Sequence, residues 1–400
     1  MPILRRLLPT LVVALALAGP AWAQSPLEDR LAKALVVPHV RLAQSSAVVI
    51  DLTSGRPLFV RNGDVPLAPA SNEKLPIAFA ALSGLGPSFR FQTDVLGTGS
   101  QEGSVWRGDI VLKGYGDPTL SSAGLRSLAR QLRAAGIARV TGAIVGDETW
   151  FDTHRTAPGW KPSYFIDESP PLSALIVDRA RYGRTISREP ALAAALAFRS
   201  ALRKAGIAVP GRARLGVAGD DAVTLASLES PALQSIVRWM NLESDNFTAE
   251  MLLKELGAVQ MNVGTSAAGA AVVMKLLGDA SIPLAGVRIV DGSGLSKLDR
   301  LTANTLVALL QTMWSDPTLR PSLVASLPVA GISGTLETRM RRGPARGAVL
   351  AKTGTTQVAS ALSGYVRDRY AFAVLQNGHP LSFWWARIAQ DRFATVLASA

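Results

Sequence analysis

The chain carries the stretch Pro69-Ala70-Ser71-Asn72-Glu73-Lys74-Leu75, and an apolar helical pattern follows it through residues 75–85. Within this stretch, Ser71 and Lys74 form an S-x-x-K string at the expected start of the helix. Side chains three residues apart lie on the same face of a helix within one turn. Pro76 fits this placement, because the N–H that proline lacks has no intrahelical partner in a first turn. The stretch therefore predicts a hydroxyl and an amine side by side at a helix N-terminus.

Two more strings follow in chain order, Ser244-Asp245-Asn246 and Lys352-Thr353-Gly354-Thr355. Each of the three strings has an ordinary structural explanation on its own, as a helix cap, a polar turn and a strand end. Their joint occurrence in this order is much less common, and it is typical of enzymes that transfer an acyl group to serine. The three strings together predict one active site.

The residue types suit that chemistry. The hydroxyl of Ser71 needs a group that removes its proton, and Lys74 can do so when it is neutral. Burial and a second nearby cation, for which Lys352 is the candidate, both lower a lysine pKa. The helical pattern breaks around residues 241–246. An extended loop there would present Ser244 and Asn246 to the same side, where the serine relays a proton and the amide holds a substrate amide.

The third string is expected on a strand whose free edge pairs with an extended peptide. There Lys352 and the hydroxyls of Thr353 and Thr355 would anchor a carboxylate, with Gly354 between them in the substrate-binding segment. The N–H of Thr355 would complete an oxyanion hole with the N–H of Ser71, since backbone donors at such a position stabilise developing negative charge.

The N-terminus predicts export. Arg5 and Arg6 precede an apolar run at residues 7–18, and Ala21-Trp22-Ala23 is a small-x-small cleavage site. The run is shorter than the roughly 20 residues that span a bilayer, so a retained anchor is the less favoured alternative. We expect residues 1–23 to be a signal peptide cleaved after Ala23, a periplasmic location, and no transmembrane segment.

Composition narrows the chemistry further. The chain has no cysteine, which excludes disulfides and thiol nucleophiles, and its three histidines show no metal-binding spacing, so no metal and no cofactor are expected. The formal net charge is +12, which favours contact with polyanions. Export argues against nucleic acid, and peripheral association with an anionic cell envelope or a simply solvated basic surface are the two remaining explanations.

The order of predicted elements indicates a discontinuous α/β (α+β) domain. Strand patterns at residues 47–52 and 57–61 precede the serine helix, and three more at 348–353, 359–366 and 370–376 precede a final helix at 383–397. The first and last segments must share one antiparallel sheet flanked by helices. We therefore predict one domain from residues 24–90 and 227–400, interrupted by an inserted α+β lobe at residues 91–226.

With these motifs in place, the sequence resembles the D-alanyl-D-alanine carboxypeptidase/endopeptidase family, the low-molecular-weight class C penicillin-binding proteins. The resemblance covers nearly the whole chain after the signal segment. Beyond the three motifs it rests on four further strings, which are Leu112-Lys113-Gly114-Tyr115-Gly116-Asp117-Pro118, Gly146-Asp147-Glu148-Thr149, Asp291-Gly292-Ser293-Gly294-Leu295-Ser296 and Leu327-Pro328-Val329-Ala330-Gly331 leading to Gly334-Thr335-Leu336.

The resemblance implies a β-lactamase/transpeptidase-like fold with an extra lobe between the first and second motifs. It also implies peptidoglycan stem peptides as substrate, cleaved beside a D-alanine, and β-lactam antibiotics as covalent inhibitors at Ser71. Lys74 is implied as the base, and Ser244 and Lys352 as the groups for proton relay and carboxylate binding. The chain departs from the family pattern in having a shorter insertion, and in carrying Ile176-Val177-Asp178-Arg179 where serine and asparagine are usual.

Two alternatives differ from this interpretation. A β-lactamase or esterase of the same fold would need a group that activates water against the acyl-enzyme, typically a glutamate in an E-x-x-L-N string, and none occurs between Ser244 and Lys352. A non-catalytic envelope-binding protein would show a broken motif, and all three motifs are intact. The sequence does not separate carboxypeptidase from endopeptidase action, because both cleave after D-alanine with the same residues.

Overall fold

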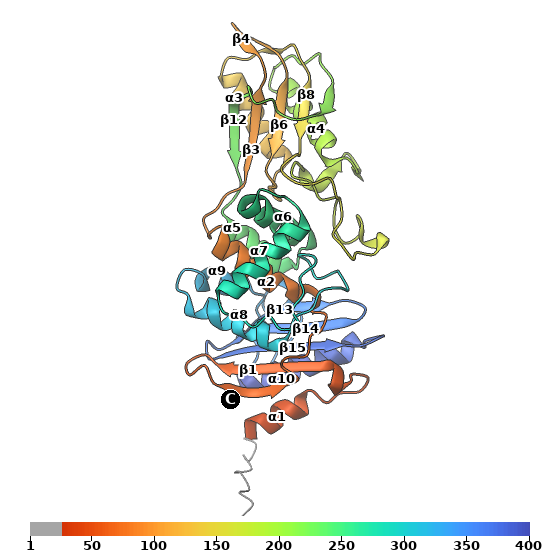
Figure 1. Cartoon of the computed structure of the whole chain (residues 1–400), viewed down its shortest axis with the longest axis vertical. Helices are drawn as coiled ribbons and strands as arrows, with labels where there is room; N and C mark the ends of the chain where they lie inside the picture. The colour runs from red at the N-terminus through yellow and green to blue at the C-terminus, as the bar shows by residue number, and fades with distance from the viewer. Residues whose placement is uncertain (1–25) are drawn as a thin grey trace, which may run out of the picture.

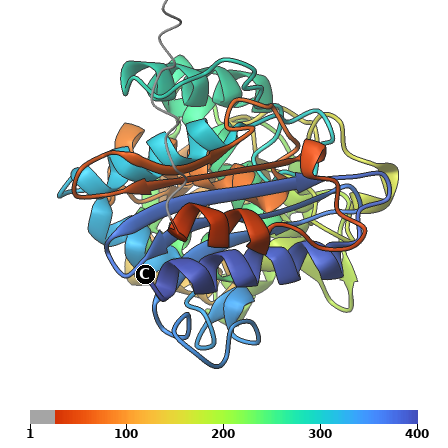
Figure 2. The same ribbon diagram turned by 90° about the horizontal axis from the view of Figure 1, so that it is seen from below.

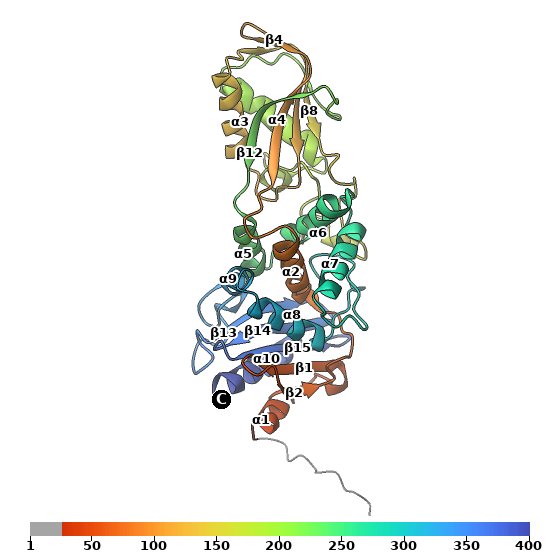
Figure 3. The same cartoon turned by 60° about the vertical axis from the view of Figure 1, so that its left-hand side comes forward.

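The computed structural model describes residues 26–400, so the predicted signal peptide at residues 1–23 lies outside the described part. Two lobes follow one another along the long axis of the molecule (Figure 1). The main lobe is built from residues 26–91 and 230–400. The inserted lobe, residues 92–229, is built from the middle of the chain and stands beyond helices α5 and α6 (Figure 3).

The main lobe is organised by a five-stranded antiparallel sheet in the order β13-β14-β15-β1-β2. Strands β1 and β15 pair from Ser45↔Gln376 to Asp51↔Tyr370, so the first and last segments share one sheet, as the sequence predicts. The strands are β1 (Ser45–Asp51), β2 (Pro57–Arg61), β13 (Val349–Thr355), β14 (Ala359–Val366) and β15 (Tyr370–Asn377). All eight residues of β14 are buried, which fits a strand with helices on both of its faces.

One face of this sheet is covered by α1 (Pro26–Ala34) and α10 (Phe383–Ala398), which lie side by side beneath it (Figure 2). Leu31 from α1 and Phe393 from α10 join Phe372 of β15 in a buried cluster. The aromatic end of α10 points away from this cluster, since Trp384 is 66% exposed.

The other face is covered by helices arranged around α2 (Lys74–Gly84). Every residue of α2 from Lys74 to Leu82 is buried, which explains why its sequence is apolar on all sides instead of amphipathic. Within residues 26–400 no single helix is long and apolar enough to cross a bilayer, and α6 with α7 meets those criteria only as a pair bent by 77°. The surrounding helices are α5 (Leu233–Glu243), α6 (Asn246–Met261), α7 (Ser266–Asp279), α8 (Ala303–Ser315) and α9 (Arg320–Ser326).

The inserted lobe has its own sheet, in the order β11-β8-β6-β3-β12, and its own core around Leu112, Leu128 and Phe198. Helices α3 (Ser122–Ala134) and α4 (Pro190–Lys204) pack in that core. The sheet strands are β3 (Gln92–Gly97), β6 (Ile110–Gly114), β8 (Ile144–Asp147), β11 (Ala213–Leu215) and β12 (Val223–Glu229). Smaller strands are β4 (Ser100–Glu102), β5 (Val105–Arg107), β7 (Arg139–Val140), β9 (Arg181–Tyr182) and β10 (Thr185–Ile186).

The chain enters the inserted lobe along β3 and leaves it along β12, and these two strands are antiparallel neighbours. The boundary that the sequence places between residues 226 and 227 falls inside β12, because residues 227–229 still pair with β3. The division into two domains itself remains a prediction.

The break between α5 and α6 is shorter than the sequence suggests. The predicted extended loop at residues 241–246 is wrong, because α5 continues to Glu243 and α6 begins at Asn246. Ser244 ends α5 in the left-handed conformation (φ 57°), and the Asp245 side chain caps α6 by accepting a hydrogen bond from the N–H of Thr248. A C-terminal cap next to an N-terminal cap turns the chain in two residues.

Candidate active site

Ser71 lies in a short 3-10 turn, η2 (Ala70–Glu73), directly before α2. It is therefore one turn ahead of the α-helix and not within it. Ala70, the residue before it, is buried and has φ 48°. A non-glycine residue in this region is strained and is retained only when its surroundings fix it. The backbone at Ser71 is thus held in a constrained position.

Strand β13 runs against this turn, and Gly354 allows the close approach. A Cβ atom added to Gly354 would lie 3.0 Å from the backbone nitrogen of Ser71 and 2.9 Å from the carbonyl oxygen of Pro69. On the same strand, the carbonyl oxygen of Lys352 accepts a hydrogen bond from Nδ2 of Asn72 at 3.2 Å. The glycine of the third motif therefore brings β13 up to the first motif.

Lys74 is buried and connects the first motif to the second. Its Nζ donates to Oγ of Ser71 at 3.0 Å, to Oδ1 of Asn246 at 2.9 Å and to the carbonyl oxygen of Ser293 at 2.7 Å. An ammonium group has three donors, so all three are used. When Lys74 is neutral, two donors can keep the contacts with Asn246 and Ser293 while the lone pair faces the hydroxyl of Ser71.

Burial lowers the pKa of Lys74 to about 8, while the negative charges of Asp291, Asp245, Glu250 and Glu73 oppose the fall. Burial is also the main cause that lowers the pKa of Lys352 well below its usual range, and the charge of Lys74 adds to it. From the sequence, burial and the charge of Lys352 are both expected to lower the pKa of Lys74. In the structure burial lowers it, and between the two lysines it is the charge of Lys74 that lowers the pKa of Lys352.

Lys352 connects the third motif to the second. Its Nζ donates to Oγ of Ser244 at 2.9 Å and to the carbonyl oxygen of Thr353 at 2.9 Å. Four of the predicted site residues thus form two hydrogen-bonded pairs, Ser71 with Lys74 and Ser244 with Lys352. Asn246 joins the first pair, since its Oδ1 accepts from Lys74.

The amide of Asn246 is occupied at both ends. Its Nδ2 donates to the carbonyl oxygen of Glu168, in the inserted lobe, at 3.2 Å. The sequence predicts that this amide is available for a substrate amide. In the structure its oxygen orients Lys74, and a substrate would have to replace the contact with Glu168.

The two threonines of the third motif have hydrogen-bond partners that are distant in sequence. Oγ1 of Thr353 donates to Oγ1 of Thr335 at 2.7 Å, and Nη2 of Arg387 donates to Oγ1 of Thr355 at 3.3 Å. Thr335 belongs to the Gly334-Thr335-Leu336 string, to which the sequence alone assigns no role. Arg387 lies on α10, and nothing in its sequence surroundings marks it. Its guanidinium adds a positive charge where a substrate carboxylate is expected.

A cluster of four buried carboxyl groups lies behind Lys74. Its members are Glu73, Glu250, Asp291 and Asp299, each 0% exposed. Oε1 of Glu250 accepts from the N–H groups of Gly292 and Ser293 at 3.0 and 2.8 Å. Asp291 accepts from the N–H groups of Gly294 and Ser296 and from the indole of Trp160.

These bonds position the loop whose Ser293 carbonyl holds Lys74. Burial raises the pKa of Glu250 to about 8 and raises those of Glu73 and Asp299 well above their usual range. Within residues 26–400, no group of three or more histidine or acidic side chains is placed to hold a metal ion.

Sequence comparisons place the chain among known enzymes. It matches the D-Ala-D-Ala carboxypeptidase 3 (S13) family over residues 27–189 and 183–398. It is 33% identical over 490 residues to a D-alanyl-D-alanine carboxypeptidase of Actinomadura sp. (strain R39), which covers 98% of this chain and 89% of that protein. It is 35% identical over 397 residues to a carboxypeptidase of Mycobacterium tuberculosis, which covers 92% of this chain and 82% of that protein.

Solved structures show the same fold. Penicillin binding protein 4 from Haemophilus influenzae superposes with a TM-score of 0.81 at 22% identity, over 94% of this chain and 99% of that chain. A structure of the same Haemophilus protein complexed with a β-lactam gives a TM-score of 0.76. The predicted mixed α/β fold with an antiparallel sheet flanked by helices is confirmed.

Proposed function

This chain belongs to the D-Ala-D-Ala carboxypeptidase 3 (S13) family, and we propose that its reaction on peptidoglycan stem peptides passes through an acyl-enzyme on Ser71. The enzyme is a serine-type, penicillin-binding D-Ala-D-Ala carboxypeptidase. The observation that carries the proposal is the contact between Lys74 and Ser71, in which a buried amine with a pKa of about 8 lies 3.0 Å from the hydroxyl.

Acylation begins with neutral Lys74. Its Nζ takes the proton of the Ser71 hydroxyl while Oγ attacks the carbonyl carbon of the penultimate D-alanine. The carbonyl oxygen becomes an oxyanion, which the N–H groups of Ser71 and Thr355 stabilise. Gly354 supports this arrangement, since β13 can approach the turn at Ser71 only without a side chain there.

Collapse of the tetrahedral intermediate breaks the C–N bond and releases the terminal D-alanine. Its nitrogen needs a proton. Ser244 can give its hydroxyl proton to this nitrogen and take in return the proton that Lys74 removed from Ser71, so Lys74 becomes neutral again. Nζ of Lys352 holds Ser244 in place by donating to its Oγ. The carboxylate of the leaving D-alanine would bind at Thr353, Thr355 and Arg387. Water then cleaves the Ser71 ester. Lys74 takes a proton from the attacking water and returns it to Oγ of Ser71 as the shortened peptide leaves. Endopeptidase action would be the same chemistry on a cross-linked D-alanine.

A β-lactam would react by the same attack but keep its leaving nitrogen tethered to the acyl group. The Haemophilus protein of the same fold has been solved with a β-lactam bound. We propose that this enzyme is acylated at Ser71 in the same way. Lasting acylation, and not steady turnover, is expected, because the chain lacks the E-x-x-L-N string between Ser244 and Lys352.

The test is covalent labelling by a fluorescent penicillin, followed by peptide mapping. We expect one label on wild type at Ser71 and none on Ser71→Ala. Labelling that persists in Ser71→Ala would overturn the assignment. Mass spectrometry of a muropeptide digest then measures the reaction itself, since loss of one alanine identifies carboxypeptidase action and loss of a cross-link identifies endopeptidase action.

We also propose that residues 1–23 are a signal peptide and that the enzyme works in the periplasm, where peptidoglycan is found. The basic n-region, the short apolar run and the Ala21-Trp22-Ala23 site support this proposal. The measurement is the N-terminus of protein recovered from the periplasmic fraction, which should begin at Gln24. A mature chain that still begins at Met1 would contradict it.

A further inference from the structure

Three consecutive residues of the inserted lobe have a strained backbone. Asp178, Arg179 and Ala180 have φ values of 48°, 58° and 60°, and none of them is glycine. Left-handed conformations of this kind persist where the surrounding contacts fix them, and they gather at functional sites. The contacts of the first two residues point in opposite directions.

Asp178 is fixed to the inserted lobe. Its backbone N–H donates to the carbonyl oxygen of Leu120 at 3.0 Å, and its Oδ1 accepts from the N–H of Ser122 at 3.1 Å. The hydroxyl of Ser122 donates to its other carboxylate oxygen. Asp178 is therefore held at the first turn of α3.

Arg179 is fixed to the main lobe. Its Nη2 lies 2.5 Å from Oδ1 of Asp245, and its guanidinium lies 5.3 Å from the ring centre of Phe247. Asp245 is the middle residue of the second motif, and its side chain is 13% exposed. The same Oδ1 accepts from the N–H of Thr248 at 2.8 Å. A charge-assisted bond to a mostly buried carboxylate is among the stronger polar contacts.

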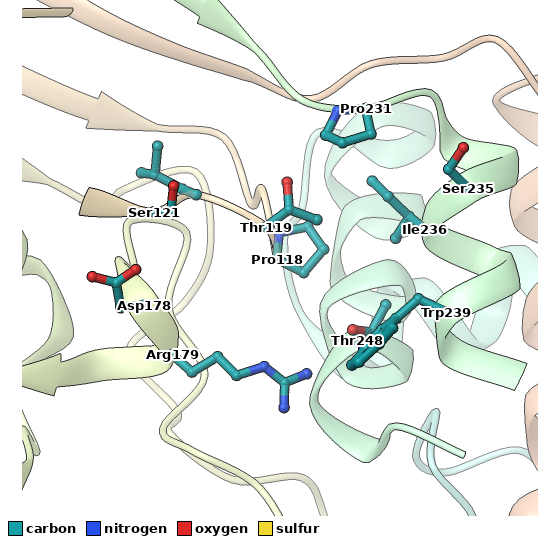
Figure 4. A pocket seen from close by; sticks show the side chains of 11 residues that line it. Pro118, Thr119, Ser121, Asp178, Arg179, Pro231, Ser235, Ile236, Trp239 and Thr248 are labelled. Atoms are coloured by element: carbon teal, nitrogen blue, oxygen red, sulfur yellow. The ribbon is translucent and has the colours of Figure 1, made fainter. Parts of the chain in front are cut away.

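A cavity of about 380 Å³ lies beside this bridge. Thr119 and Asp178 line it on the side of the inserted lobe, and Ser235 and Trp239 of α5 line it on the side of the main lobe. Figure 4 shows Arg179 reaching across from the inserted lobe toward Trp239 and Thr248. Arg179 therefore spans the two sides of the cavity and makes its ion pair with Asp245 there.

We infer that Arg179 is a positioning residue for the acylation reaction, which holds the break between α5 and α6 at the geometry that the second motif requires. The inference rests on the proposed function. Ser244 and Asn246 lie directly on either side of Asp245, and they contact Lys352 and Lys74 respectively, each at 2.9 Å. A fixed Asp245 therefore keeps Ser244 and Asn246 within hydrogen-bonding distance of the two lysines. Asp178 anchors the other end of this connection in the inserted lobe.

The experiment compares Arg179→Met with Arg181→Met, a matched control at an exposed arginine two residues away. Methionine keeps an unbranched apolar stem over Phe247 and removes the charge. We expect the second-order rate of labelling by fluorescent penicillin to fall at least about tenfold in Arg179→Met, because small displacements of catalytic groups cost up to about 10²-fold in rate. Arg181→Met should label at the wild-type rate. A labelling rate within twofold of wild type in folded Arg179→Met would overturn the inference.

Two further measurements separate positioning from folding. Arg179→Ala opens space beside the cavity, and guanidinium ion at sub-denaturing concentration should restore part of its labelling rate while leaving Arg181→Ala unchanged. A double-mutant cycle with Asp245→Asn should be strongly non-additive, since Arg179 acts through that carboxylate. Absence of rescue together with additive effects would overturn the inference even if the single variants label slowly.

Failure of the proposed function gives a different result. Wild type would then not label at Ser71 at all, whereas the positioning role predicts a change relative to wild type. Amide hydrogen exchange covers that case, because it needs no activity. Exchange at residues 244–248 should be faster in Arg179→Met than in Arg181→Met, and equal exchange in the two variants would count against the inference.

Discussion

At the scale of single residues, the chemistry depends on one proton of Lys74. The charged form uses all three of its N–H donors on Ser71, Asn246 and Ser293, so it cannot accept the proton of Ser71. With a pKa of about 8, about one-tenth of the molecules carry neutral Lys74 at pH 7. Burial therefore makes a base available near neutral pH, where an exposed lysine would be almost fully charged.

This pKa predicts the pH dependence of acylation. Lys74 is charged below about pH 8 and neutral above it, so the second-order labelling rate should rise about tenfold per pH unit below pH 8 and level off above it. The measurement is penicillin labelling of wild type from pH 6 to about pH 9.5, checked for folding by circular dichroism at each pH. A rate that falls as pH rises toward 8 would contradict the role of neutral Lys74 as the base.

Glu250→Gln tests whether the buried carboxyl cluster sets this midpoint. The charge of Glu250 raises the pKa of Lys74, so its removal should move the midpoint of the labelling profile to lower pH. The glutamine oxygen can keep the two bonds from Gly292 and Ser293, and its NH₂ would stand where Oε2 has no partner. A surface variant, Glu337→Gln, should leave the midpoint unchanged. An unchanged midpoint in folded Glu250→Gln would show that the cluster acts only on structure.

The sequence predicts contacts between site residues that are close together in the chain. It does not predict their contacts with residues that are distant in the chain. Ser71 and Lys74 could be paired from sequence because one helical turn brings them together. Ser293 and Arg387 could not, because they reach the site only through tertiary packing of a loop and of α10. The buried carboxyl cluster could not be predicted for the same reason, since its four members come from three separate parts of the sequence and nothing in a single chain marks an acidic residue as buried.

At the scale of elements, the decisive contact is the one between β13 and the turn at Ser71. The backbone nitrogen of Ser71 lies 3.0 Å from where a Gly354 side chain would begin, so any side chain there must push the strand and the turn apart. The strand itself could be predicted from its alternation and its turn residues. Its closeness to the turn could not, because that distance depends on how the sheet packs on α2.

Gly354→Ala should separate these two elements. The contacts at 2.9 and 3.0 Å require the strand and the turn to move apart by a few tenths of an ångström. We therefore expect the labelling rate to fall, but by less than the roughly 10²-fold that a shift of about 1 Å in the reacting groups costs. Gly278→Ala in α7 is the matched control, since its added Cβ would meet only Leu284, at 3.5 Å. The measurement is the labelling rate together with the thermal unfolding midpoint. A Gly354→Ala variant that keeps the wild-type rate would show that the close approach is not needed for acylation.

The α5–α6 break shows why predicted boundaries differ from the structure. The helical pattern of α5 continues to Glu243, and the turn is made by the left-handed Ser244 and the capping Asp245 alone. The break in the helical pattern at residues 241–246 favours a loop of that length. In the structure Asn241 is a buried helical residue whose side chain donates to Ser326. Tertiary hydrogen bonding here outweighs local propensity.

At the scale of the whole molecule, the two lobes are joined at one place in the chain and are in contact at several others, of which the largest apolar one lies at α6. They are joined where Phe91 and Ser230 are hydrogen-bonded neighbours, with the N–H of Ser230 donating to the carbonyl oxygen of Phe91 at 2.9 Å. They are in contact where Phe247 and Met251 of α6 share a buried cluster with Leu172 and Ile176 of the inserted lobe. Because Phe91 and Ser230 are adjacent, the two segments of the main lobe can meet without the insertion. Because Phe247 directly follows Asn246, the contact at α6 lets the inserted lobe affect the position of the second motif.

Excision of residues 92–229 separates these two roles. Because hydrogen-bonded antiparallel neighbours are about 5.5 Å apart, a two-residue turn such as Asn-Gly can join Phe91 to Ser230. The two buried clusters on either side of the main sheet use no residue from 92–229, so the shortened protein should still unfold cooperatively. Exposure of Phe247 and Met251 alone should lower its stability by roughly 3–6 kcal/mol, taking roughly 1.5–3 kcal/mol for each buried side chain. The buried Lys254 also loses its ion pair with Asp152.

The labelling rate of this shortened protein gives the decisive comparison. It lacks Arg179 and Glu168, the groups that contact Asp245 and Asn246 from the inserted lobe. It should therefore bind penicillin covalently at Ser71, but no faster than full-length Arg179→Met. Labelling at the wild-type rate would show that the inserted lobe has no part in positioning the second motif. A broad, non-cooperative melting transition would show instead that the main lobe does not fold without it.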